Sequence, residues 1–468
     1  MSMDYRTKYL KYKNKYLNLN NNMTGGGFNL INPFTGKKIE MPAEIFHNIL
    51  SFLPDEDKIK WASYNPTADI GIQFLNNLIT FKEAMSNIKD EFKIIDKFKI
   101  TKIEVDNLYE LNELITKQGP LYIRKLVFSD ELFNEPLGTT LDRLTNLKEL
   151  RFGFTFNRPL GKSLEKLTNL KELSFGFRFN EPLETSLDTL TNLKALKFGY
   201  GFNRPLGKSL ERLTNLEILI FDSYNWPLIT NENGTLISSL AGLTNLKGLD
   251  FGHMLQQPLI YDINRTLISS LAGLSNLQKI RFAPSFNQPL IINKYGTSVS
   301  LLANLTKLKT LILPRDFNQP LTYNVNGINI SAFEGLLNLE KLVLGLYFNH
   351  SLSTSLAGLT NLQELIIDKR FNQPLDASLV GLTELRKIQL GNNLYETSYN
   401  KEFEYIDPVS KKRVSVFDGL INLQEIMCGN KPQLFFKLLS SINLSKLNHL
   451  IVIKFADDWK QWVIINDN

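Results

Sequence analysis

The stretch FNRPLGKSLEKLTNLKELSFGFRFNEPL, residues 156–183, contains the same pentad twice. Phe-Asn-x-Pro-Leu begins at Phe156 and again at Phe179, 23 residues later. The pentad recurs along the chain, beginning at Phe133, Phe156, Phe179, Phe202, Phe286, Phe317, Phe348 (where Ser351 replaces the Pro) and Phe371, with degenerate copies at Tyr224 and Leu255. Successive copies are 22 or 23 residues apart, except for four consecutive intervals of 31. Such a period predicts a solenoid of stacked rungs.

The segment between two pentads, residues 163–176, has two apolar patterns. Leu164, Leu167 and Leu170 are three residues apart, which is typical of a short helix or a 3₁₀ turn. Leu173 and Phe175 then alternate with polar residues, as in a short strand with one buried face. One rung is therefore predicted to consist of a strand, a turn and a short helix.

The pentad itself is best explained by packing. In a solenoid, equivalent residues of every rung have the same environment, so the Phe is expected to fill an interior slot. The Asn side chain can bond backbone groups left unpaired at the bend. The Pro lacks an N–H group, which ends strand pairing and turns the chain. A phosphate-binding loop at Gly161-Lys-Ser is excluded, because the glycine required five places earlier is Phe156.

These repeats resemble leucine-rich repeats, and more closely the FNIP variant named for its Phe-Asn-x-Pro core. The resemblance is strong over residues 121–395. It implies the fold class α/β, with a leucine-rich-repeat-like solenoid from residue 99 to a C-terminal cap ending at 468.

Composition and charge argue against several classes of function. The net charge of +6 is concentrated at the N-terminus, where residues 1–19 hold five basic residues and one Asp. The remaining chain has no basic stripe, so we expect no nucleic acid partner. No run approaches 18 apolar residues, so no membrane partner is expected. A single cysteine, Cys428, favours a reducing compartment. Scattered histidines and the lack of paired catalytic groups predict no enzyme activity, metal site or cofactor.

Residues 41–57, MPAEIFHNILSFLPDED, predict a helix that is apolar nearly all round. Pro42 suits its first turn and Pro54 closes it. Such a helix must be covered on both sides, either by residues 59–98 alone or partly by another protein.

The same stretch resembles the start of an F-box. It matches that pattern at Pro42, Glu44, Ile45, Ile49, Leu50, Phe52, Leu53, Pro54 and Asp57, with Met41 in place of Leu. The second half of the pattern is not clear after Trp61. The resemblance implies a small helical domain, residues 39–98, that docks on a Skp-type adaptor of a cullin ligase. The adaptor-binding residues it implies are Pro42, Ile45, Ile49, Leu50, Leu53 and Pro54.

The first 24 residues form a basic leader with tyrosines at helical spacing, and residues 25–38 are interpreted as a glycine-containing linker. The leader resembles those of many giant DNA virus proteins, which implies action in the cytoplasm or nucleus of a host cell. MTGGG, residues 23–27, also resembles cleavage sites of adenovirus-type cysteine proteases, although a plain linker is the favoured interpretation.

Each of the four 31-residue rungs carries about eight extra residues directly after its Pro-Leu. Asn233-Gly234 and Asn326-Gly327 predict two-residue hairpin turns. The predicted pairs in the last insert are Val325 with Ile328 and Tyr323 with Ile330. We expect the hairpins to join into a small second sheet along one edge, and residues 402–417 to be a candidate for another hairpin.

Two surfaces are therefore candidates for binding a partner. Alternation predicts that aliphatic residues of the strands face away from the core, at Ile218, Ile220, Ile312, Val343 and Ile366. The inserts offer Tyr261 and Tyr323, and residues 225–332 are the favoured surface.

Two functions remain open. The first is a substrate-recruiting F-box subunit of a Skp–cullin–F-box ubiquitin ligase, which binds an unknown protein, expected to be of the host, through its repeats. The second is a non-catalytic structural or assembly protein of a virus particle, which uses the repeats as an interaction scaffold.

Overall fold

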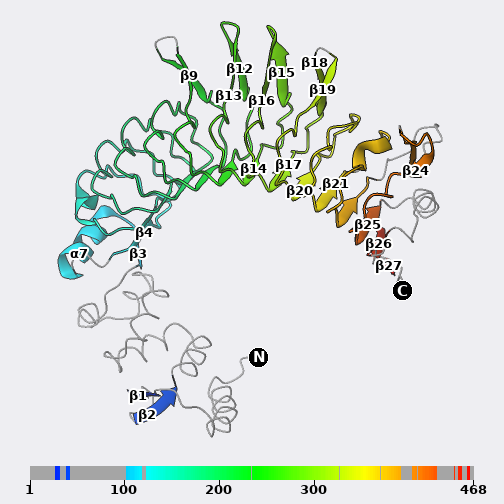
Figure 1. Cartoon of the computed structure of the whole chain (residues 1–468). Helices are drawn as coiled ribbons and strands as arrows, with labels where there is room; N and C mark the ends of the chain where they lie inside the picture. The colour runs from blue at the N-terminus through cyan, green and yellow to red at the C-terminus, as the bar shows by residue number, and fades with distance from the viewer. Residues whose placement is uncertain are drawn as a thin grey trace. The chain divides into compact units, whose positions relative to one another are not determined.

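The structure is a computed structural model of the 468-residue chain. It describes residues 27–31, 38–42, 102–118, 123–232, 235–325, 327–368, 370–391, 403–407, 409–428, 447, 449, 452–455 and 461–463 (Figure 1). The chain divides into two compact units, Met1–Gly153 and Phe154–Asn468. Among the described residues of both units, short strands are the main regular elements.

In the first unit, the described residues include an antiparallel pair, β1 (Gly27–Ile31) and β2 (Lys38–Pro42), with Phe28 opposite Met41. The sequence interpretation differs here, because it expects a linker at 25–38 and a helix beginning at Pro42. Apolar and polar residues alternate in most of both stretches, which is a strand pattern, and Pro42 is the last residue of β2. The other predicted adaptor-binding residues, Ile45, Ile49, Leu50, Leu53 and Pro54, lie outside the described residues.

The described part of the first unit also contains three parallel strands and a helix: β3 (Lys102–Val105), α7 (Leu108–Gln118), β4 (Lys125–Phe128) and β5 (Glu149–Arg151), with the 3₁₀ turn η2 (Thr140–Arg143) before β5. Asn107 and Glu110 fix the start of α7. The Glu110 N–H donates to Asn107 Oδ1, and the Asp106 N–H donates to Glu110 Oε2, each at 2.9 Å. This reciprocal capping satisfies two N–H groups that a helix start leaves unpaired. Leu111, Leu114 and Ile115 of α7 are buried.

The second unit is a solenoid whose rungs each contribute one strand to a parallel sheet. The strands are β6 (Glu172–Ser174), β7 (Ala195–Phe198), β8 (Ile218–Phe221), β11 (Gly248–Asp250), β14 (Lys279–Arg281), β17 (Thr310–Ile312), β20 (Lys341–Val343), β21 (Glu364–Ile366), β22 (Lys387–Gln389), β25 (Glu425–Cys428) and β26 (Val452–Phe455), with β27 (Gln461–Val463) antiparallel to β26. Within this unit the sheet lies on one side of the rungs, and the insert hairpins project from the other (Figure 1).

The return path of each rung is a chain of tight turns. The Leu167 N–H donates to the Leu164 carbonyl at 3.0 Å, and the Leu170 N–H to the Leu167 carbonyl at 2.9 Å. These three-residue bonds confirm the predicted 3₁₀ geometry. In the described part of the second unit a regular 3₁₀ element is assigned at η3 (Asp376–Leu379). The leucines at this spacing are fully buried, because every third side chain of such a turn faces the core.

The phenylalanines of the pentad form a stacked column through the core. Phe156, Phe179 and Phe202 lie on successive rungs with ring centroids 6.1 and 6.0 Å apart. Phe317 continues the column in the longer rungs, 6.3 Å from the ring on either side. Tyr224 occupies the same slot in a degenerate copy and donates its hydroxyl to the Arg204 carbonyl. The interior role predicted for the pentad is confirmed.

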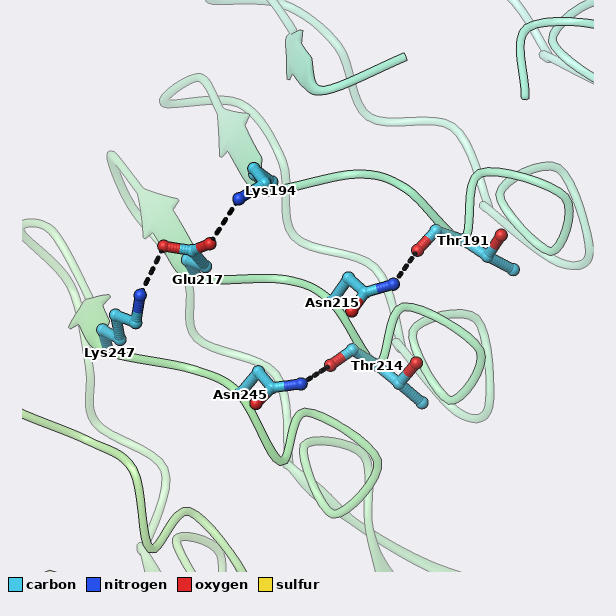
Figure 2. Close-up of polar contacts among 7 residues, drawn as sticks. All are labelled: Thr191, Lys194, Thr214, Asn215, Glu217, Asn245 and Lys247. Carbon is cyan, nitrogen blue, oxygen red and sulfur yellow. Dashed lines mark hydrogen bonds and ion pairs between the residues drawn. The ribbon is translucent and has the colours of Figure 1, made fainter. Parts of the chain in front are cut away.

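The pentad asparagine joins each rung to the next. Asn180 Oδ1 accepts the backbone N–H of Asn203 at 3.0 Å, and Asn318 Oδ1 accepts that of Asn349 at 2.9 Å. A second asparagine column lies in the return path, where Asn215 Nδ2 donates to the Thr191 carbonyl at 2.9 Å; Asn245 donates to Thr214 in the same way (Figure 2). Both columns supply partners for backbone groups that the bends leave unpaired.

The inserts fold as hairpins: β9 (Ile229–Glu232) with β10 (Thr235–Ser238), β12 (Ile260–Ile263) with β13 (Thr266–Ser269), β15 (Ile291–Lys294) with β16 (Thr297–Ser300), and β18 (Thr322–Val325) with β19 (Ile328–Ser331). Val325 pairs with Ile328 and Tyr323 with Ile330, as predicted. A further hairpin, β23 (Glu404–Ile406) with β24 (Arg413–Ser415), occupies the insert at 402–417.

The expected second sheet does not form. Each insert hairpin is a separate two-stranded sheet, although the hairpins project side by side from the rungs (Figure 1). Side chains join neighbouring hairpins instead, since Lys294 Nζ and Tyr295 Oη both lie 3.0 Å from Asp262 Oδ2. The right-handed twist of each two-stranded ribbon carries its edges away from its neighbours, which accounts for the missing ladder bonds.

Candidate functional site

The outer face of the parallel sheet carries the aliphatic residues predicted from alternation. In the three-residue strands of this sheet whose side chains are described, the central residue is buried, and those on either side are partly or fully accessible. Ile218 is 45% exposed and Ile312 is 37% exposed, while Ile220, Val343 and Ile366 are half-buried. These residues therefore face away from the core. Their contact with a partner stays a prediction.

Strand register brings only three of these five residues together. Ile312 pairs with Val343, and Val343 pairs with Ile366, so the three side chains occupy one position on β17, β20 and β21. We call this row the aliphatic strip. Ile220 occupies the same position on β8, but Asp250 and Arg281 separate it from the strip and form an ion pair of 3.2 Å. Ile218 lies at the other accessible position of β8.

Charged side chains cross from rung to rung at the beginning of the strands. Glu217 lies between Lys194 and Lys247, each 2.7 Å from one of its carboxylate oxygens (Figure 2). The hydrogen bonds from Lys194 and then Lys247 lower the pKa of Glu217 from 4.5 to about 2. Further along, Lys309 pairs with Glu340 at 2.8 Å. This edge is therefore largely neutralised by its own ion pairs.

The side chains of the two insert tyrosines are less exposed to solvent than the sequence suggests. Tyr261 is only 9% exposed, and its hydroxyl accepts the Leu228 N–H of the preceding rung at 3.1 Å. Burial raises its pKa. Tyr323 is half-buried, and burial raises the pKa of its hydroxyl as well. Tyr261 is thus an internal residue and not part of an open surface. The cause is that the base of each hairpin packs on the rungs, where Ile260 and Ile291 are also buried.

One exposed feature was missed by the sequence reasoning. Phe154, Phe177 and Tyr200 follow the strand position of three successive rungs and stack with centroids 4.8 and 5.2 Å apart. They are 46%, 44% and 43% exposed, and we call them the aromatic row. A glycine precedes each ring; a Cβ on Gly199 would lie 2.1 Å from the Gly176 carbonyl oxygen, so glycine permits this close approach. The repeated Gly-aromatic dipeptide was the available signal.

The described residues contain no group of His, Cys, Asp and Glu side chains that could hold a metal ion. In the same part of the chain, no helix is both long and apolar enough to cross a membrane. The side chain of Cys428 is not among those described, while its backbone is the last residue of β25.

No family model and no curated protein matches the sequence. Among solved structures, the protein CroV588, a novel circular leucine-rich-repeat protein, is similar to this chain with 20% identity and a TM-score of 0.51. The alignment covers 77% of this chain and 44% of CroV588. The fold is that of a leucine-rich-repeat solenoid.

Two bacterial structures of the same kind were also found at lower similarity. An internalin of Listeria monocytogenes aligns over 69% of this chain and 77% of its own length, with 19% identity and a TM-score of 0.43. A leucine-rich-repeat protein of Leptospira interrogans aligns over 75% of this chain and 82% of its own length, with 19% identity and a TM-score of 0.45. The fold assignment rests on the repeat geometry and on CroV588.

Proposed function

We propose that this chain recruits proteins through its solenoid and is attached through residues 39–98 to a Skp-type adaptor of a cullin ubiquitin ligase. The aliphatic strip is the observation that carries the protein-binding part. Its side chains lie outside the core, so folding does not require them to be apolar, and Ile312 is 37% exposed. Apolar groups in such a place favour burial against a partner.

The adaptor part of the proposal rests on sequence. The F-box pattern from Pro42 to Asp57 precedes the repeats, and that order suits a subunit that holds the ligase at one end and its target at the other. The proposed site of action is the cytoplasm or nucleus of a host cell. In this role the chain supplies binding surfaces and leaves the chemistry to its partners.

The adaptor proposal is tested with Leu50→Asp in the full chain. A charge forced into a dry interface without a partner costs about 3–5 kcal/mol, so binding to a purified Skp-type adaptor should be lost. Isothermal titration calorimetry measures the affinity. Ser51→Asp places the same charge at a variable position of the motif and should bind normally, and hydrogen exchange should show unchanged rungs. The proposal is contradicted if the adaptor does not bind the parent protein, or if it binds the Leu50→Asp variant with the same affinity as the parent.

The second candidate function is assembly within a virus particle, and the aromatic row favours it. Three stacked, partly exposed rings at adjacent rungs present a continuous apolar edge, which suits contact with further protein subunits. Abundance of the chain in purified particles, together with self-association that Phe177→Ser weakens, would favour assembly over recruitment.

A further inference from the structure

Three successive rungs form a cationic cluster beyond the ends of β17, β20 and β21. The Arg315 guanidinium carbon lies 5.5 Å from the centroid of the Tyr347 ring, and that of Arg370 lies 4.2 Å from it. Arg315 Nη2 also donates to the Tyr347 hydroxyl at 3.2 Å. Arg315 and Arg370 are exposed, and Tyr347 is half-buried. The rung of Tyr347 lies between the other two, so one ring holds both arginines.

The electrostatics of the cluster favour an anion. Two guanidinium groups flank one ring, while the carboxylate of Asp316 lies 3.9 Å from Arg315 Nε. The hydrogen bond from Arg315, together with the charges of Arg315 and Arg370, lowers the pKa of Tyr347. Cations that are stacked on a ring lose less side-chain freedom when they bind a ligand. A guanidinium also matches a carboxylate with two parallel hydrogen bonds.

The aliphatic strip lies on the same three rungs. Each of its residues precedes a member of the cluster by a few positions: Ile312 before Arg315, Val343 before Tyr347, and Ile366 before Arg370. Three or four extended residues span about 10–14 Å, so one short peptide can reach both features. The beginnings of these strands are occupied by ion pairs, such as Lys341 with Glu364 at 2.6 Å.

This combination is local and is not a property of every rung. In the equivalent strand-end loops of the first rungs of this unit, the rings of the aromatic row stack on one another, and the contact there is ring on ring instead of arginine on tyrosine. The repeat core is the same in both places. The cluster therefore lies in the part of the rung that the fold leaves free to vary.

We propose that Arg315, Tyr347 and Arg370, with the aliphatic strip, bind an acidic peptide segment of a partner protein, which places an aliphatic side chain on the strip and a carboxylate between the arginines. This inference deepens the proposed recruiting function by naming the chemistry of the recruited segment. It does not depend on adaptor binding, so either part can fail alone.

The test is selection from a display library of random heptapeptides against the full chain and against the double variant Arg315→Gln, Arg370→Gln. Peptides enriched on the parent should contain Asp or Glu close to Leu, Ile or Val, and the double variant should lose that enrichment. A fluorescent copy of a selected peptide should bind the double variant at least about tenfold more weakly, because two charge-assisted contacts are lost. The melting temperature should stay the same, since both side chains are exposed.

Matched controls separate the site from a general charge effect. The double variant Arg178→Gln, Arg204→Gln removes the same charge from loops of the first rungs and should bind the peptide like the parent. Ile312→Ser should weaken binding through the loss of apolar contact. Equal acidic enrichment on the parent and on the Arg315→Gln, Arg370→Gln variant would overturn the proposal. A labelled oligouridylate that binds the parent and is lost in that variant would also overturn it, in favour of nucleic acid.

Discussion

The 23-residue rungs and the 31-residue rungs of the second unit have one core and two different surfaces. Rings in the Phe column are 6.0 Å apart between Phe179 and Phe202 and 6.3 Å apart between Phe286 and Phe317. The asparagine column is equally regular, with bonds of 3.0 Å from Asn203 to Asn180 and 2.9 Å from Asn349 to Asn318. The eight additional residues leave these contacts unchanged. The pentad therefore determines how the rungs stack, and an insert adds a hairpin to the rung without changing that stacking.

The largest effect is expected when one ring is removed from each kind of rung. Phe179→Ala and Phe317→Ala each delete a fully buried side chain with stacked neighbours on both sides. Each variant should lose about 3–5 kcal/mol of local stability. Native-state hydrogen exchange is the appropriate measurement, because repeat arrays need not unfold in a single step.

The control for the Phe variants is Phe177→Ala, whose ring is 44% exposed. It should cost less than about 1 kcal/mol. If Phe317→Ala were as mild as this control while Phe179→Ala was severe, the two kinds of rung would not share one core.

A smaller effect is expected at a contact that only the inserts provide. Tyr261→Phe keeps the buried ring but removes the hydroxyl that accepts the Leu228 N–H at 3.1 Å. A buried donor left without a partner costs about 1–3 kcal/mol. The loss should appear as faster hydrogen exchange around Leu228. Tyr295→Phe, at a 56% exposed hairpin position, should change stability much less. Equal effects would show that the hairpin bases are not part of the packed structure.

Much of this architecture could be predicted from the sequence, because equivalent residues of a repeat have the same packing environment in every rung. The period predicted the solenoid, the spacing of Leu164 and Leu167 predicted the tight turns, and the Gly327 turn predicted the register of the last insert. All of these depend on local backbone geometry, which residue type controls directly.

The remaining features depend on relations between rungs. Alternation in an insert does not tell which face packs on the neighbouring rung, so the burial of Tyr261 could not be predicted from it. The strip formed by Ile312, Val343 and Ile366 needs strand register to be recognised as continuous. The cluster around Tyr347 could not be recognised from the sequence, because its residues come from three loops that are brought together only when the rungs stack. The strands at Gly27–Ile31 and Lys38–Pro42 were missed because the glycines before them favoured a linker interpretation.

The smallest expected effect concerns the junction between the two kinds of rung. Glu217 precedes the first insert and binds Lys194 of a 23-residue rung and Lys247 of a 31-residue rung. Its pKa in the folded chain is about 2, against an ordinary value of 4.5. A carboxyl with a depressed pKa stabilises the fold fully above its unfolded pKa, and that contribution is lost as the pH falls from about 4.5 towards 2. Because the group is exposed to solvent, salt screens the effect.

Carbon NMR of labelled glutamate side chains measures the titration of Glu217 directly. In the Lys194→Gln variant its pKa should rise part of the way to 4.5, and in the double variant Lys194→Gln, Lys247→Gln it should rise further, since each lysine supplies one hydrogen bond. Lys309→Gln leaves Glu217 untouched and is the matched control. If Lys194→Gln alone restored the ordinary value, the bond to Lys247 across the junction would be absent in solution. A stepwise rise would show that the two kinds of rung are joined by the same ion-pair contacts that link equal rungs.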